Sequence, residues 1–278
     1  MSIVFPWNED DFEPLLESCE TDEVTPYILK HLPKDGKLVE AGCGLGRYVK
    51  YLADQGYDIV GIELNGDAVR HVKRKAPELK IIQGDVLRFP FSTASVDGII
   101  SLGVIEHFIE GCEAPLREIH RVLKRTGRAI ITVPCVNGVR KMKKSLYVPE
   151  LRYRMNPIRV AKRSNRLRRV FGKPLLPKSR YNRGQSGRYD IYPVYGDFFE
   201  YRLEKGEFES ALRQAGFTIL ESAPVAHLDG LLHEFGRFFV RFDHWRLRPS
   251  RLGTVVNGLL SRVPFCHNHM HLCVVTRS

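Results

Sequence analysis

The stretch Val39-Glu40-Ala41-Gly42-Cys43-Gly44-Leu45-Gly46 decides the fold of this chain. It joins the end of a short apolar run to a segment, residues 47–52, that reads as the first turns of a helix. Glycines at every second position let the backbone turn tightly and let a ligand approach the main chain without meeting a Cβ atom. A strand, a glycine turn and a helix in this order predict a nucleotide-binding crevice, in which the helix N-terminus attracts an anionic group.

The spacing of the glycines separates this turn from the dinucleotide fingerprint. The chain has G-x-G-x-G, with Glu40 two residues before it, instead of G-x-G-x-x-G. A second apolar run ends in Val60-Gly61-Ile62-Glu63, and Glu63 lies 19 residues after Gly44. An acidic side chain at that distance is placed to accept hydrogen bonds from ribose hydroxyls.

Strand and helix patterns alternate along the chain. Further strands are expected at 80–86, 96–103 and 127–134, and helices at 48–55, 67–76 and 114–124. Alternation at short spacing predicts an α/β fold, with a parallel sheet covered by helices on both faces. With 278 residues, the chain is long enough to bury a full core as one domain.

The ordered motifs resemble those of class I S-adenosylmethionine-dependent methyltransferases, in the small-molecule branch that includes ubiquinone-type enzymes. The resemblance covers about residues 21–135 and resumes at 204–224, and residues 271–276 are expected to form a seventh strand at the edge of the sheet. It implies a Rossmann-like seven-stranded sheet, S-adenosyl-L-methionine as cofactor and methyl transfer as activity. The motifs that carry it are Glu-x-Gly-x-Gly-x-Gly, Gly-Ile-Glu, Gly-Asp-Val, Asp-Gly-Ile-Ile-Ser, Ile-Glu-His and Gly-Arg-Ala-Ile-Ile-Thr-Val-Pro.

The same resemblance implies a set of cofactor-binding residues. Glu40 would orient the methionine amino group, although a carboxylate there can also cap the following helix. Asp85 would meet the adenine, with a turn role as the alternative, and Arg47 would meet the cofactor carboxylate unless it is simply solvated. The full set is Glu40, Gly42, Cys43, Gly44, Gly46, Arg47, Glu63, Leu64, Asp85, Val86, Leu102 and Gly103.

Two residues after the fourth strand are the catalytic candidates. Glu106 and His107 stand where the methyl group would be delivered, and a histidine there can act as general base toward a hydroxyl acceptor. The alternative is that His107 only packs near the cofactor. His227 and Asp229, after the sixth strand, are further candidates. O-methylation of a small-molecule or lipid-linked acceptor is the first hypothesis, with a carboxylate or nitrogen acceptor nearly as well supported.

The positive charge of the chain is concentrated in one insertion. Residues 138–188 hold 17 Lys/Arg and one acid, whereas the whole chain carries a net charge of +11. Such a segment can bind RNA, anionic lipid headgroups or a phosphorylated substrate, or can be a solvated face. An RNA methyltransferase docking through this insertion is the second hypothesis, and a non-catalytic cofactor-binding protein is the third.

Four segments are expected along the single domain. They are an N-terminal cap (1–35), a cofactor-binding core (36–136), the basic insertion (137–190), with a helix at 156–170, and a C-terminal part (191–278) with a helical cover at 229–263. Apolar residues at helical spacing predict cover helices at 231–245 and 252–263. These helices either roof the substrate pocket or, with the basic insertion, favour an anionic membrane surface over RNA as partner.

The remaining features bear on metals and location. Cys266, His267, His269, His271 and Cys273 lie along one extended segment, whereas zinc sites draw ligands from separated pairs, so no metal is expected. The six scattered cysteines are expected to be reduced. With no apolar run of about 18 residues and no basic, apolar leader at the N-terminus, the expected location is cytoplasmic, with the inner membrane surface as an open alternative.

Overall fold

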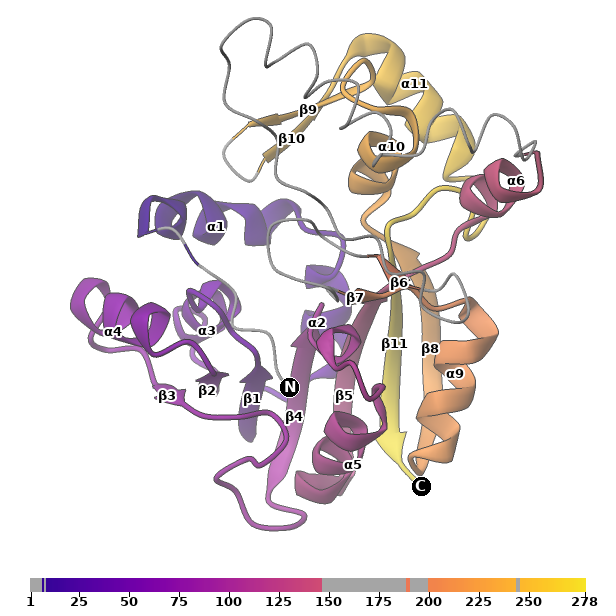
Figure 1. Cartoon of the computed structure of the whole chain (residues 1–278). Helices are drawn as coiled ribbons and strands as arrows, with labels where there is room; N and C mark the ends of the chain where they lie inside the picture. The colour runs from indigo at the N-terminus through magenta and orange to yellow at the C-terminus, as the bar shows by residue number, and fades with distance from the viewer. Residues whose placement is uncertain (1–6, 8, 147–188, 191–199, 244–245) are drawn as a thin grey trace, which may run out of the picture.

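The fold is a seven-stranded sheet with helices on both faces (Figure 1). The computed structural model describes residues 7, 9–146, 189–190, 200–243 and 246–278. Its strand order is β3-β2-β1-β4-β5-β11-β8. The strands are β1 (Lys37–Ala41), β2 (Asp58–Glu63), β3 (Ile81–Gln83), β4 (Val96–Leu102), β5 (Leu123–Pro134), β8 (Phe217–Val225) and β11 (Met270–Arg277).

The last strand lies inside the sheet and not at its edge. β11 pairs antiparallel with β5 on one side and with β8 on the other, so the edge position predicted for residues 271–276 is wrong. The physical reason is burial, because Leu272 to Val275 are fully buried. A strand that is apolar toward both faces suits an interior position, whereas β8 shows several half-exposed residues and forms the edge.

Helices cover the two faces of the sheet because successive strand residues point to opposite sides. Leu38 packs into one core cluster and Val39 into the other, and Ile130 and Ile131 divide in the same way. Helices α1 to α4 contribute to the first cluster, and α5 and α9 to the second. These helices are α1 (Phe12–Ser18), α2 (Thr25–His31), α3 (Arg47–Ala53), α4 (Gly66–Lys75), α5 (Glu113–Val122) and α9 (Lys205–Gln214).

The glycine turn between β1 and α3 requires glycine for two separate reasons. Gly42, Gly44 and Gly46 all have positive φ, at 67°, 55° and 75°. A Cβ atom on Gly42 would lie 2.7 Å from a methyl group of Val104. The turn therefore combines a left-handed backbone with a close approach of neighbouring chain.

We expect Gly42→Ala to lower the free energy of unfolding by about 3 kcal/mol, from left-handed strain plus overpacking. Gly56→Ala is the matched control, because Gly56 has φ +84° but open space where its Cβ would be. Backbone strain alone should lower the free energy of unfolding of Gly56→Ala by about 1 kcal/mol. Urea unfolding of both variants checks this, and equal losses would show that the contact with Val104 contributes nothing.

A cover lies beyond the carboxyl ends of the parallel strands, at the top of Figure 1. It consists of α10 (His227–Phe235), a hairpin of β9 (Val240–Asp243) and β10 (Arg246–Pro249), and α11 (Arg251–Leu260). The predicted helix 231–245 is therefore wrong beyond Phe235. Gly236 follows α10 with φ +84°, and the chain after it turns into the hairpin. The second predicted helix, 252–263, is present as α11.

Part of the basic insertion lies within the described residues as α6 (Gly138–Leu146). The predicted helix 156–170 falls outside them. The remaining short elements are β6 (Tyr189–Asp190), which pairs with β7 (Glu200–Tyr201), and the 3-10 turns η1 (Glu9–Asp11), η2 (Cys19–Thr21) and η3 (Ile105–His107). None of the helices in the described ranges is long and apolar enough to cross a membrane.

Candidate active site

A cavity of about 1030 Å³ opens at the carboxyl ends of β1, β2 and β4. In open α/β sheets, ligands bind at this edge. Residues from the N-terminal cap and from the cover also line the cavity. Of the twelve residues predicted to bind the cofactor, all but Gly44 and Gly46 line it, and those two belong to the adjoining turn. A volume of this size accommodates a nucleotide-sized ligand with an acceptor beside it.

Glu63 at the end of β2 is held rigidly toward the glycine turn. Its carboxylate accepts hydrogen bonds from the backbone N–H of Gly44, at 2.7 Å, and of Asn65, at 2.8 Å. The side chain is buried, and its two hydrogen-bond donors belong to the backbone. Because these donors cannot rotate away as side chains can, they fix the orientation of the carboxylate. The carboxylate also lines the cavity, where the ribose of a nucleotide would lie.

Glu40 at the end of β1 is a buried carboxyl group. It accepts a hydrogen bond from the N–H of Val49 in α3, at 3.2 Å, so the predicted alternative of a carboxylate bonded to the following helix is present. Burial raises the pKa of Glu40 to about 8, against the opposing effect of the Arg47 guanidinium. Its presence in the cavity lining is as expected, and its contact with a cofactor amino group stays a prediction.

Arg47 and Asp85 each have protein partners besides their place in the cavity lining. Arg47 pairs with Asp22 at 2.8 Å and donates to the hydroxyl of Ser18 at 2.9 Å, which ties the N-terminal cap to α3. Asp85 accepts from the N–H of Leu87 at 2.9 Å, as a turn residue does. The alternative that Arg47 is simply solvated is therefore wrong, and Asp85 has the turn role that the sequence left open.

Trp7 is a lining residue that sequence reasoning missed. A Cβ atom on Gly44 would lie 2.3 Å from its indole ring. The aromatic ring lies so close to the glycine backbone that it leaves no room for a Cβ atom at position 44. No local motif marks Trp7, because its place depends on where the N-terminal segment crosses the sheet edge.

Beyond the end of β4, three ionisable groups converge on the cavity. The 3-10 turn η3 presents Glu106 and His107, and β7 contributes Glu200, with ligand-type atoms of all three within 4.8 Å of one another. Glu106 is 2% exposed, and its Oε2 atom has no hydrogen-bond partner in the described part of the chain. Burial, with the Glu200 carboxylate as a smaller effect, raises the pKa of Glu106 well above its usual value. Such a shift favours the protonated form of Glu106.

Glu200 was not predicted, because it follows the basic insertion and lies more than 90 residues from His107 in the sequence. It pairs with Arg202 at 3.1 Å. Glu200 lies beside His107 only because of the tertiary packing of the chain.

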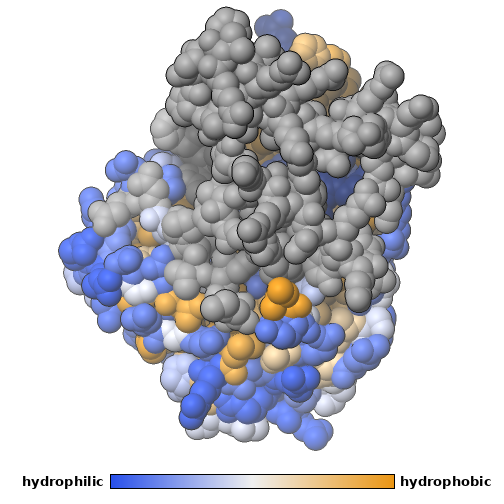
Figure 2. Space-filling model, viewed as in Figure 1, coloured by the Kyte–Doolittle hydropathy of each residue, from blue (hydrophilic) through white to orange (hydrophobic). Residues whose placement is uncertain are grey.

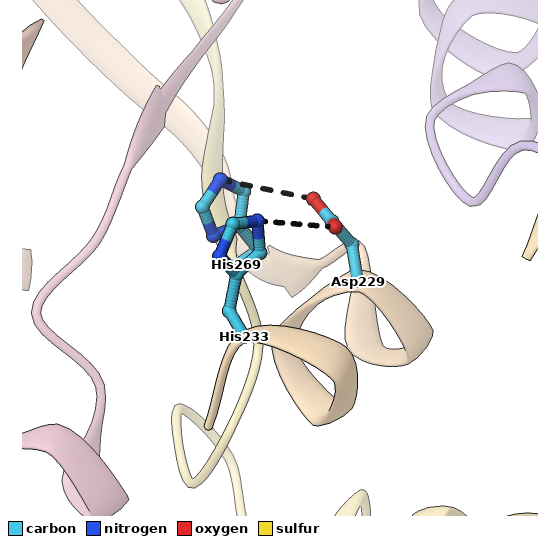
Figure 3. Close-up of side chains that lie close together, drawn as sticks. All are labelled: Asp229, His233 and His269. Carbon is cyan, nitrogen blue, oxygen red and sulfur yellow. Dashed lines mark ion pairs between the residues drawn. The ribbon is translucent and has the colours of Figure 1, made fainter. Parts of the chain in front are cut away.

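The cover contributes a second group of side chains to the same cavity. Asp229 and His269 line it, and His233 lies beside them (Figure 3). Burial lowers the pKa of His269 to about 2, so its imidazole is neutral. His227, by contrast, pairs with Glu23 at 2.5 Å and does not line this cavity. The two candidates after β8 therefore have different positions. Asp229 lines the cavity, whereas His227 binds the N-terminal cap.

The sheet order with one antiparallel strand and the acidic residues around the glycine turn define the class I methyltransferase fold. Residues 39–131 match the family of methyltransferase domains. A probable S-adenosylmethionine-dependent methyltransferase of Mycolicibacterium smegmatis is 30% identical over 112 residues, which are 40% of this chain and 43% of that protein. The chain therefore contains the domain of class I S-adenosylmethionine-dependent methyltransferases, whose cofactor is S-adenosyl-L-methionine.

Other relatives differ in what they act on. A tRNA (carboxymethyluridine(34)-5-O)-methyltransferase of Xenopus tropicalis is 30% identical over 132 residues, 47% of this chain and 20% of that protein. A demethylmenaquinone methyltransferase of Beutenbergia cavernae is 31% identical over 96 residues, 34% of this chain and 39% of that protein. The chain spans less than half of the length of these relatives.

Solved structures resemble most of the chain in fold. A putative S-adenosylmethionine-dependent methyltransferase from Listeria monocytogenes covers 91% of this chain and 97% of its own, with a TM-score of 0.53 and 16% identity. At that identity the likeness shows the fold alone.

The pKa of Glu40 leads to a pH dependence of cofactor binding. Below pH 8 the buried carboxyl group carries a proton, which must leave before the group can pair with the cofactor's ammonium. We therefore expect the affinity for S-adenosyl-L-homocysteine to rise roughly tenfold per pH unit from pH 6 toward 8 and then to level off. Calorimetric titration across this range checks the slope. Glu40→Gln should abolish it, and a flat profile in the unchanged protein would contradict the assignment.

Proposed function

We propose that this protein transfers a methyl group from S-adenosyl-L-methionine to a hydroxyl group of a small-molecule or lipid-linked acceptor. The observation that supports this most directly is the position of His107. It lies in η3, just after β4 and the predicted cofactor-binding residues Leu102 and Gly103, and lines the same cavity.

The cofactor supplies an activated methyl group, so the protein mainly has to align the acceptor and remove its proton. His107 would accept the proton of the hydroxyl group. Glu106, whose pKa is raised by burial, would donate a hydrogen bond to the acceptor rather than act as base.

The lipid-linked form of the acceptor is supported by an exposed apolar stripe on α11 and the residues after it. Leu252, Val255, Leu259 and Val263 recur at helical spacing, and each is 49–58% exposed. Arg251 and Arg262 flank the stripe as exposed cations. A few hydrophobic residues are visible at the top of Figure 2, on the side where the cover lies in Figure 1. A stripe of this kind beside positive charge suits the surface of an anionic membrane.

We expect the double change Leu252→Glu with Leu259→Glu to weaken binding to phosphatidylglycerol-containing vesicles at least about tenfold, because two leucines leave the acyl boundary. Leu220→Glu is the matched control, since Leu220 is 47% exposed on the edge strand β8. Vesicle co-sedimentation measures the effect. An equal loss in both variants, or no binding by the unchanged protein, would contradict membrane docking through α11.

The deciding experiment for the function uses methyl-labelled S-adenosyl-L-methionine and a cell extract split into lipid, small-molecule and RNA fractions. Label in the lipid or small-molecule fraction supports the proposal. Label in RNA would favour the second candidate, which rests on the tRNA-modifying relative and on the basic residues 138–188. Tight cofactor binding without label in any fraction would favour a non-catalytic role.

A further inference from the structure

Three side chains of the cover converge at one point beside the cavity. Asp229 and His233 lie on α10, and His269 precedes β11 (Figure 3). The Nε2 atom of His233 is 3.4 Å from one carboxylate oxygen of Asp229, and the Nε2 atom of His269 is 3.7 Å from the other. Ligand-type atoms of the three residues all lie within 4.8 Å of one another.

These separations are longer than hydrogen bonds but close to the spacing of two ligands around one metal ion. N–H···O hydrogen bonds measure about 2.7–3.2 Å. Ligands at about 2.0–2.1 Å from a tetrahedral zinc ion are about 3.3 Å apart. The two imidazole rings are stacked, with centroids 4.4 Å apart and planes 8° from parallel, so both edges face the same carboxylate.

The backbone around the cluster is tightly held. Gly230, next to Asp229, approaches the chain at His267 so closely that a Cβ atom on it would lie 1.7 Å from a carbonyl oxygen. The N–H of His269 donates to Ala226 at 3.1 Å, and its carbonyl accepts from the N–H of Cys135 at 2.8 Å. α10 and the residues just before β11 are thus fixed side by side. His269 therefore lies opposite Asp229 and His233.

The charges near the cluster are compatible with a cation. Two arginines act electrostatically on His269, and each has its own carboxylate. Arg140 pairs with the buried Glu234 at 2.7 Å, and Arg202 pairs with Glu200 at 3.1 Å. These pairs offset one another in charge, and Asp229 is the acidic member of the cluster.

We propose that Asp229, His233 and His269 form a binding site for a divalent transition metal, with Zn²⁺ as the preferred ion. Two ligands four residues apart on a helix, with a third from a distant segment, are the arrangement of zinc sites that keep an open position. Because Asp229 and His269 line the cavity, the open position faces it. The proposal differs from the expectation of no metal, which rested on residues 266–273 without the facing helix α10. It does not depend on the proposed methyl transfer.

The test is a titration of the metal-stripped, full-length protein with Co²⁺, followed by its visible absorption, and with Zn²⁺ as competitor. We expect one Co²⁺ per chain, and a loss of affinity of at least about tenfold in His233→Ala and Asp229→Asn. His233 is half-exposed and Asp229→Asn preserves shape, so both variants should fold, and an unchanged affinity for S-adenosyl-L-homocysteine verifies this.

His107→Ala is the matched control, because His107 belongs to the other group of ionisable residues in the same cavity. It should leave Co²⁺ binding unchanged. Three results would overturn the proposal: no stoichiometric binding, binding that survives in His233→Ala and Asp229→Asn, or binding that is lost only in His107→Ala. Because the readout needs no turnover, a failure here is distinguishable from a failure of the methyl-transfer assay.

Discussion

Replacing His107 by alanine should lower kcat for methyl transfer about 10²- to 10³-fold, the usual contribution of a general base. The cofactor affinity should stay unchanged, because His107 lies beyond the residues predicted to hold the cofactor. The measurement is a steady-state assay with the acceptor found in the labelling experiment, combined with a calorimetric titration with S-adenosyl-L-homocysteine.

His31→Ala serves as the control for this prediction. His31 pairs with Glu221 at 2.6 Å and does not line the cavity, so its removal should leave kcat as it is. If His107→Ala retains full activity, His107 is a packing residue, and the proton must go to another group. A fall in cofactor affinity equal to the fall in kcat would instead assign His107 to cofactor binding.

Replacing Glu63 by alanine should weaken the affinity for S-adenosyl-L-homocysteine about 10²-fold. The change would remove the carboxylate that we expect to accept hydrogen bonds from the ribose hydroxyls, and hydrogen bonds to a charged group contribute about 1.5–3 kcal/mol each. It also leaves the N–H groups of Gly44 and Asn65 without the carboxylate that fixes the turn. Calorimetry measures the dissociation constant directly.

Glu78→Ala removes an exposed carboxylate outside the cavity and should leave the affinity unchanged. Glu63→Gln removes the charge but keeps one acceptor oxygen, so only one of the N–H groups of Gly44 and Asn65 retains its acceptor. An affinity of Glu63→Ala within threefold of the unchanged protein, roughly 0.6 kcal/mol or less, would remove Glu63 from the cofactor site.

The core of the fold was predictable because its signals are local. The glycine turn, Glu63 and the strand patterns up to Pro134 each depend on neighbouring residues. The structure has a strand in each predicted range, but β3 covers only Ile81–Gln83 of the predicted 80–86. The position of β11 in the sheet could not be predicted, because the sequence of a strand shows how apolar it is but not which strands flank it. The helix predicted over 231–245 failed at Gly236, where a single left-handed residue outweighs the apolar periodicity on either side.

The acceptor side of the cavity could be predicted only in part. His107 and Glu106 follow a strand motif and were found from it, as was Asp229 after β8. The position of Glu200 depends on where β7 lies, and the stacking of His233 on His269 depends on how α10 lies against the residues before β11. His269 was weighed only with its sequence neighbours, because nothing in the local pattern indicates that α10 faces it.

The N-terminal cap has a kinetic consequence. Asp22 holds Arg47 at the glycine turn, and the adjacent Glu23 holds His227 at the start of α10. Asp22 and Glu23 thus connect the N-terminal cap both to the glycine turn and to the cover. We expect S-adenosyl-L-homocysteine to dissociate only when the N-terminal cap moves away from the cavity. The same movement should break the contact between the cap and the cover above the acceptor. Turnover would then be limited by product release, and both products would be discharged in a single opening event.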